Sequence, residues 1–213
     1  MVVRIAVFAS GSGSNFEALV RAARGGKVAG EVVLLVCDRP GAPVLARAAR
    51  LGVPTFVFDP KAYPDKAAYE RAILAELEAH GVDLVVLAGY MRLIGPTLLA
   101  AYEGRMINLH PSLLPAFPGK NAIGQALAHG VKVTGVTVHF VDAGMDTGPI
   151  IAQRAVPVEE DDTPETLAAR IHAVEHELLP QVVQWLIEGR VRRADGRRVR
   201  VLPAASEMDR GSG

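Results

Sequence analysis

Two short segments of the sequence hold side chains that suit acyl transfer. Residues 108–115 have the sequence Asn-Leu-His-Pro-Ser-Leu-Leu-Pro, and residues 145–149 have the sequence Met-Asp-Thr-Gly-Pro. They supply the carboxamide of Asn108, the imidazole of His110 and the carboxylate of Asp146. An amide N–H stabilises an oxyanion, an imidazole moves a proton, and a carboxylate orients the imidazole. The sequence therefore predicts a site for acyl transfer built from these three residues.

A loop rich in glycine and serine, residues 9–15, directly follows the first apolar run and opens a predicted helix. Free backbone N–H groups and the helix dipole favour an anion at such a position, and glycines let the backbone approach it closely. A dinucleotide fingerprint needs a third glycine where Phe16 stands, and the Lys-Ser/Thr ending of a Walker loop is absent. We therefore expect a monophosphate here. The alternative is a turn capped by Asn15 without a ligand.

The elements that must position these residues alternate between short apolar runs and helix-like stretches, which predicts parallel βαβ units. The runs are continuously apolar, so we expect strands buried on both faces of one doubly wound, mostly parallel sheet with helices on both sides. Ligands then bind at the carboxyl ends of the strands. The predicted strands are residues 2–9, 32–36, 55–58, 84–88 and 106–109, and the predicted helices are 15–24, 43–51, 66–80, 95–102 and 122–129.

The last third of the chain predicts two more strands and one long helix. Residues 133–141 alternate in polarity and residues 150–158 form a second strand. Asp162, with Glu165 three residues later, predicts a capping box that opens the helix, and Pro180 should bend it.

The C-terminal stretch is basic but contains a turn signal. Residues 194–196, Ala-Asp-Gly, lie between two short Val/Arg runs and predict a solvent-facing hairpin rather than a nucleic-acid-binding arm. We expect three parts: a catalytic domain over residues 1–190, a basic hairpin over 191–203 that packs on it, and a disordered tail over 204–213.

Composition restricts the class of protein. Half of the 213 residues are hydrophobic, enough for one sizeable core, and 23 basic residues balance 23 acidic ones, so nothing attracts nucleic acid or an anionic membrane. Cys37 is the only cysteine, no secretory signal is present, and no apolar run approaches the roughly 20 residues that span a bilayer. We expect a cytoplasmic protein with small-molecule partners. The sequence leaves the oligomeric state open, a homodimer included.

Five ordered motifs make this α/β chain resemble the phosphoribosylglycinamide formyltransferases, the folate-dependent enzymes of purine synthesis. The resemblance covers about residues 1–190 and lies in segments 11–15, 87–92, 108–115, 138–141 and 145–149. It implies a Rossmann-like formyltransferase fold. It also implies transfer of the formyl group of 10-formyltetrahydrofolate to the amine of phosphoribosylglycinamide, through a tetrahedral intermediate and without a metal. The expected products are formylglycinamide ribonucleotide and tetrahydrofolate.

The resemblance also implies roles for the three residues named first. Asn108 donates its amide to the developing oxyanion. His110 stabilises the intermediate and helps to move protons, and Asp146 holds His110 and favours its charged form. Some members carry a second histidine where this chain has Asn121 and Ile123, so we assign no catalytic role there.

Binding residues follow from the same resemblance. The substrate phosphate is assigned to Gly13, Ser14 and Asn15, and the sugar hydroxyls to Glu175. Lys66 stands where the family often has an arginine that contacts the folate. The rest of the folate pocket is assigned to Met91, Arg92, Leu93, Ile94, Asp142, Ala143, Gly144 and Met145.

Three unrelated interpretations compete with this one. Residues 172–176 spell the H-x-x-E-H pattern of a zinc-peptidase class, although no third ligand is evident. Ser112, His110 and Asp146 suggest a hydrolase, but the G-x-S-x-G elbow is missing. A non-catalytic nucleotide-binding module keeps the glycine loop but does not need a polar Asn-x-His at a strand end. His139 lies in the alternating strand, and we interpret it as structural.

Two closer rivals share the fold and a similar Asn-x-His and Asp. Methionyl-tRNA formyltransferase carries an additional C-terminal domain, and formyltetrahydrofolate deformylase usually carries an N-terminal regulatory domain. This chain begins at its first strand and ends soon after its last helix, so we expect neither. The glycine and serine loop also favours a phosphoribosyl substrate.

Overall fold

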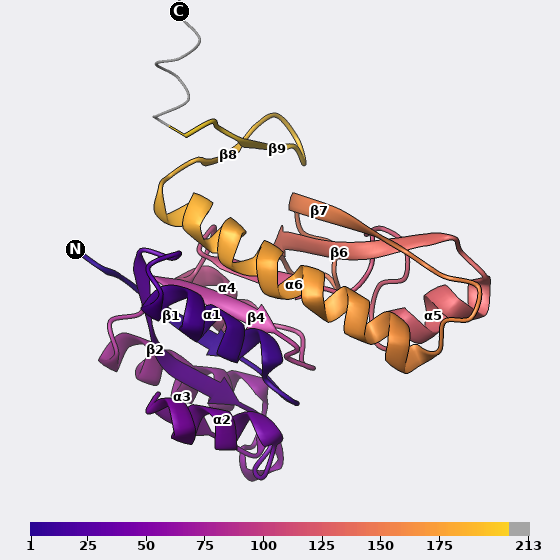
Figure 1. Cartoon of the computed structure of the whole chain (residues 1–213). Coiled ribbons are helices and arrows are strands. Elements are labelled where there is room, and N and C mark those ends of the chain that lie inside the picture. Colours follow the sequence, from indigo (N-terminus) through magenta and orange to yellow (C-terminus); the bar gives the residue numbers. More distant parts are fainter. Residues whose placement is uncertain (205–213) are drawn as a thin grey trace, which may run out of the picture.

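Seven strands form one sheet in the order β3-β2-β1-β4-β5-β6-β7. The computed structural model describes residues 1–204 (Figure 1). The pairs formed among β1 to β5 are parallel, and β6 is antiparallel to both of its neighbours, β5 and β7. This confirms the predicted mostly parallel sheet. The strands are β1 Val3–Phe8, β2 Gly30–Cys37, β3 Thr55–Val57, β4 Leu84–Ala88, β5 Met106–His110, β6 Val133–Phe140 and β7 Ile150–Pro157.

Helices cover both faces of the sheet, as the doubly wound prediction requires. One hydrophobic core contains Phe16, Val44 and Leu178 from α1, α2 and α6, and the core on the other face contains Ile73 and Leu98 from α3 and α4. The helices are α1 Ser14–Arg24, α2 Pro43–Leu51, α3 Lys66–Ala79, α4 Pro96–Ala101, α5 Ala122–His129 and α6 Pro164–Ile187, with one 3₁₀ turn, Pro60–Ala62.

The strand order reverses between β1 and β4, which leaves a crevice at their carboxyl ends. The loop after β1 meets the loop after β4 there, because the Ser10 N–H donates to the Gly89 carbonyl at 3.0 Å. Strand β5 ends beside them at His110. The fold therefore gathers three of the predicted site segments at one edge of the sheet.

Strand β6 differs from the half-exposed strand that alternating polarity usually indicates. Its polarity does alternate, but every residue after Val133 is buried. Val136 and Val138 enter the core that α6 also lines. Thr137 and His139 face the other way and are buried as well. The polar face of β6 is therefore turned toward the crevice and not toward solvent.

Helix α6 begins one residue later than the sequence predicts. Its N-cap is Thr163, which forms a capping box with Thr166, and not Asp162 with Glu165. The Asp162 carboxylate instead accepts hydrogen bonds from Arg170 at 2.8 and 3.0 Å, and this contact lowers its pKa. The cap prediction was wrong because Thr and Asp are both good caps, and the arginine partner becomes available only in the folded helix.

A two-stranded hairpin follows α6. Strands β8, Val191–Arg193, and β9, Val199–Val201, pair antiparallel, with Arg192 opposite Arg200. Figure 1 shows the hairpin beyond the end of α6, on the same side of the molecule as β7. All of the predicted tail except Ala204 lies outside the described residues. In the described part of the chain, no helix has the length and apolar character needed to cross a bilayer.

Candidate active site

A cavity of about 450 Å³ opens at the carboxyl edge of the sheet. Walls come from the loops after β1, β4 and β5, from the loop between β6 and β7, and from α6. Lys66 and Ala143 are the two predicted residues that are not part of the wall. The wall includes Gly13, Ser14, Asn15, Met91, Arg92, Leu93, Ile94, Asn108, His110, Asp142, Gly144, Met145, Asp146 and Glu175.

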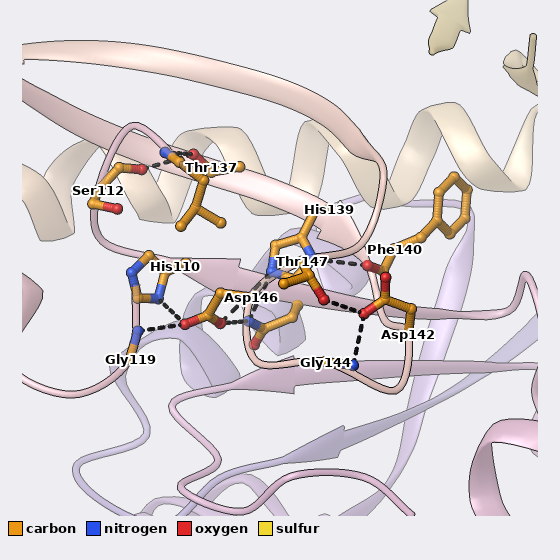
Figure 2. Close-up of polar contacts among 12 residues, drawn as sticks. His110, Ser112, Gly119, Thr137, His139, Phe140, Asp142, Gly144, Asp146 and Thr147 are labelled. Atoms are coloured by element: carbon orange, nitrogen blue, oxygen red, sulfur yellow. Dashed lines mark hydrogen bonds and ion pairs between the residues drawn. The ribbon is translucent and has the colours of Figure 1, made fainter. Parts of the chain in front are cut away.

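Asp146 joins the polar groups of this cavity (Figure 2). Its Oδ2 accepts a hydrogen bond from the Gly119 N–H at 2.7 Å and lies 3.5 Å from His110 Nδ1. Its Oδ1 accepts from the Asn108 amide at 3.3 Å. The backbone of Asp146 has a φ of 54°, a left-handed conformation that is uncommon for a residue other than glycine. The loop thus holds the carboxylate between both predicted catalytic side chains.

His110 faces an acceptor at each ring nitrogen. Nε2 lies 2.8 Å from the carbonyl oxygen of Phe117, which can only accept, and Nδ1 points to the Asp146 carboxylate. His110 is buried, with 5% of the residue's surface exposed. An imidazolium, which donates from both nitrogens, satisfies both acceptors at once. The site is therefore arranged to accommodate a positive charge on His110.

His139 belongs to the site, although the sequence analysis treated it as structural. Its Nδ1 lies 2.7 Å from the carbonyl of Phe140, and its Nε2 lies 3.1 Å from the Asn108 amide nitrogen. Burial lowers the pKa of His139, which favours the neutral ring. Nδ1 then carries the proton and Nε2 accepts from Asn108. The signal in the sequence was the alternation of Thr137 and His139 with valines, which placed both on one face.

Asn108 uses its amide hydrogens within the protein in this structure. One lies toward Nε2 of His139 and the other toward Asp146 Oδ1, the longer contact at 3.3 Å. A ligand oxygen in the cavity must therefore compete with Asp146 for one hydrogen. That competition is feasible because the bond to Asp146 is long.

The loop after β5 is tied to β6. The Thr137 hydroxyl donates to the Ser112 carbonyl at 2.7 Å and accepts from the Leu114 N–H at 3.1 Å. Ser112 is fully buried, and its hydroxyl donates to the Ala116 carbonyl at 2.6 Å. Ser112 therefore fixes the loop and is not presented as a nucleophile to His110, which argues against the hydrolase interpretation.

At the other end of the cavity, Glu175 joins α6 to the glycine loop. Its Oε2 accepts from Asn15 Nδ2 at 2.9 Å and from His172 Nδ1 at 2.8 Å, and the bond to His172 raises the pKa of that histidine. Asn15 Oδ1 is buried without a hydrogen-bond partner in the described part of the chain. The predicted phosphate loop and the predicted sugar-binding residue are thus neighbours.

The zinc interpretation of residues 172–176 finds no support in this geometry. His172 and Glu175 bond each other, while His176 lies in the wall of a separate hollow between α1 and α6. Among residues 1–204, no group of three or more histidine, cysteine, aspartate or glutamate side chains is arranged to hold a metal ion.

The glycine loop is held from outside the cavity by α2. The Arg47 side chain donates to the Ser12 carbonyl at 2.7 Å. Gly13, with a φ of 75°, approaches α2 so closely that a Cβ atom would lie 2.3 Å from a methyl carbon of Val44. Only glycine therefore fits at residue 13, which leaves the start of α1 open to a ligand.

A buried carboxylate supports the segment after β4. Asp38 accepts from Ser10 Oγ at 2.5 Å and from Arg92 Nε at 2.8 Å, and Ser10 in turn accepts from the Met91 N–H at 2.9 Å. Lys66 donates to the Leu93 carbonyl at 2.8 Å. Lys66 thus contacts the backbone of the predicted folate segment from outside the cavity. Sequence reasoning missed Asp38, because its partners are distant along the chain.

Comparisons with known proteins show the family of this chain. The family model described as formyl transferase matches residues 3–183. The chain belongs to the formyl transferase family, and within it to the phosphoribosylglycinamide formyltransferases. It is 56% identical over 184 residues to the phosphoribosylglycinamide formyltransferase of Bacillus subtilis, across 86% of this chain and 94% of that protein.

Solved structures show the same similarity in three dimensions. Glycinamide ribonucleotide transformylase 1 from Symbiobacterium toebii superposes with a TM-score of 0.92 at 51% identity, over 95% of both chains. The enzyme of the same name from Geobacillus kaustophilus gives a TM-score of 0.85 at 63% identity, over 87% of this chain and 99% of that one.

Proposed function

We propose that this protein transfers the formyl group of 10-formyltetrahydrofolate to the amine of phosphoribosylglycinamide in purine synthesis. The observation that carries the proposal is that, in one cavity, the carboxylate of Asp146 lies within 3.5 Å of both the carboxamide of Asn108 and the imidazole of His110. Each has a task in acyl transfer to an amine. The similarity to formyltransferases over most of the chain supports the same reaction.

In this proposal Asn108 and His110 act on the tetrahedral intermediate. The amine attacks the formyl carbon, and the carbonyl oxygen becomes an oxyanion. Asn108 and the protonated His110 stabilise it with the N–H groups that face Asp146 at 3.3 and 3.5 Å before the substrate binds, the longest contacts of the two side chains. As the carbon–nitrogen bond to the folate breaks, the protonated His110 gives a proton to the departing folate nitrogen, and the neutral ring then takes the proton that the amine loses, which restores the imidazolium. Asp146 keeps His110 oriented and charged, and the protein forms no covalent bond.

The phosphoribosyl end of the acceptor is proposed to bind at the glycine loop. Gly13, Ser14 and Asn15 offer backbone N–H groups at the start of α1, where the helix dipole favours a phosphate. Glu175 accepts hydrogen bonds, as binding of sugar hydroxyls requires. The buried Oδ1 of Asn15 is a further acceptor at this end of the cavity.

The folate is proposed to bind where the cavity wall is apolar. Met91, Leu93 and Met145 are about half exposed, although large apolar side chains are usually buried, and they suit a flat ring system. Arg92, Ile94, Asp142, Ala143 and Gly144 complete this proposed pocket. Lys66 is proposed to support it through the Leu93 carbonyl.

Formyl transfer with and without the acceptor tests the proposal. Purified protein and 10-formyltetrahydrofolate should give tetrahydrofolate and the formylated glycinamide only when phosphoribosylglycinamide is present, and a chelator should not change the rate. Formate released without an acceptor indicates a deformylase instead. Loss of turnover with the chelator indicates metal chemistry, and no folate turnover at all contradicts the proposal.

The remaining predictions concern the whole chain. We predict a catalytic unit over residues 1–190 with the hairpin 191–203 packed on it, and a cytoplasmic location, as suits a reaction between small metabolites. The oligomeric state, for which a homodimer is one option, can be measured by sedimentation of the purified protein.

A further inference from the structure

The loop between β6 and β7 contains Asp146 but has little packing of its own. Ala143, Gly144 and Met145 at its tip are exposed. Its internal bonds are local: Asp142 Oδ1 accepts from the Gly144 N–H at 3.0 Å and from the Thr147 hydroxyl at 2.6 Å. Such a segment needs support from elsewhere to keep one side chain in place.

The C-terminal hairpin contacts this loop at both ends. The Arg193 guanidinium lies over the ring of Phe140, 5.1 Å from its centroid, where the loop begins. The Arg197 guanidinium donates to the carbonyl of Thr147, the residue after Asp146. The loop ends are also joined to each other, because the Phe140 N–H donates to the Pro149 carbonyl at 2.9 Å.

The hairpin is itself anchored to the body of the protein. Val191, Val199 and Val201 pack against the hydrophobic core that contains Phe16 and Leu178, and strand β9 contacts β7. At the base of the hairpin, Arg190 donates through Nε to the Leu202 carbonyl at 2.7 Å. Because the hairpin is fixed to the sheet, a contact between the hairpin and the loop also holds the loop in place relative to the sheet.

The two faces of the hairpin differ. Side chains alternate along a strand, so Arg193 shares the inward face with the valines, while Arg192 and Arg200, which pair across the strands, lie on the other face. All three arginines are exposed. The hairpin thus has two arginines that contact the loop, Arg193 and Arg197, and two that can serve as matched controls, Arg192 and Arg200.

We propose that the C-terminal hairpin is a clamp for the catalytic loop, and that Arg193 and Arg197 are positioning residues for Asp146. This inference rests on the proposed function, because it assigns the clamp to the carboxylate that orients His110. Arg197 fixes the peptide group between Thr147 and Gly148, one residue after Asp146, whose left-handed backbone is easily lost. The hairpin lies after residue 183, where the family match ends.

Formyl transfer by five single variants tests the clamp. Arg197→Ala and Arg193→Ala should lower kcat about tenfold, because small displacements of a catalytic group are costly, and should leave KM for the acceptor unchanged. Arg192→Ala and Arg200→Ala should keep the wild-type rate. Arg197→Lys should recover part of the rate, since an ammonium also donates to a carbonyl. All variants should share one Tm.

Hydrogen exchange of residues 142–148 provides a readout that does not depend on the reaction. These amides should exchange faster in Arg197→Ala than in Arg200→Ala. Equal exchange and equal kcat in these two variants overturn the clamp. If wild-type protein transfers no formyl group, the proposed function fails, and the exchange experiment still decides whether the hairpin orders the loop.

Discussion

At the scale of single residues, the carboxylate of Asp146 contacts both of the side chains that are proposed to act on the substrate. Asp146 lies beside the imidazole of His110 and also holds the amide of Asn108. His110 faces the Asp146 carboxylate through Nδ1 and the Phe117 carbonyl through Nε2. The hydrogen taken from Asn108 must be released when a ligand oxygen arrives. Asp146 therefore keeps both groups in place before substrate binds.

His139 should affect the rate through Asn108. His139→Leu removes the acceptor that orients the amide, so kcat should fall, although by less than the roughly 10²–10³-fold expected when an oxyanion donor itself is lost. His139→Gln offers a carbonyl oxygen to the same amide and should retain more activity. Steady-state kinetics of both variants decide the matter, and equal rates in the two variants contradict this role.

At the scale of elements, Glu17 joins α1 to α2 below the glycine loop. Its carboxylate contacts Arg21 on α1 at 2.6 Å and, on α2, Arg47 at 2.5 Å and Arg50 at 2.8 Å. The pKa of Glu17 falls from 4.5 to about 2. The hydrogen bond from Arg21 is the largest cause and that from Arg47 the next, and burial acts in the opposite direction. Arg47 also holds Ser12, so the cluster connects helix packing with the glycine loop.

The stability lost in Glu17→Gln should depend on pH. The folded pKa lies below the unfolded one, so the ionised carboxylate stabilises the fold above about pH 4.5, and this contribution disappears as pH falls toward 2. Urea unfolding at several pH values should show the largest difference from wild type near neutrality and almost none near pH 2. Glu31→Gln is the control, because its contact with Arg4 is exposed and 3.9 Å long. A difference for Glu17→Gln that does not change with pH contradicts the prediction.

Binding of the acceptor should raise the stability of the protein, and Glu175 on α6 should be needed for most of that increase. Phosphoribosylglycinamide at about 100 times its Kd should stabilise the protein by roughly 2.7 kcal/mol and raise Tm by several degrees. Glu175→Gln should lose most of that shift. Glu177→Gln, a change at an exposed residue of the same helix, should keep it. Thermal melts with and without the acceptor measure both, and a full shift in Glu175→Gln excludes the proposed sugar contact.

At the scale of the whole molecule, the sequence predicted the sheet well because burial determines its strands. The run at 84–88 is continuously apolar and that at 106–109 is interrupted only by Asn108, and they became β4 and β5, which lie between the helix layers. Helices α2 and α5 have the predicted bounds, since Pro43 starts one and glycines with positive φ end both. Local signals were sufficient for these elements.

Other features depended on contacts between distant residues. Nothing near His139 in the sequence shows that its strand faces Asn108, or that Asp38 lies beneath Arg92. The predicted N-cap of α6 was wrong for the same reason, because Arg170 donates a hydrogen bond to Asp162 only after the helix has folded. Motifs named the residues of the site, but the order of strands in the sheet decided which of them meet.

The most direct test of the central claim compares two histidines. His110→Ala removes the imidazole that faces Asp146, so kcat for formyl transfer should fall about 10²- to 10⁴-fold while the acceptor still binds. His80→Ala removes an imidazole at the end of α3 that contacts the carbonyl and the carboxylate of Glu76, and it should leave the rate unchanged. A His110→Ala enzyme as fast as His80→Ala would show that the cavity at the carboxyl edge of the sheet is not where the formyl group is transferred.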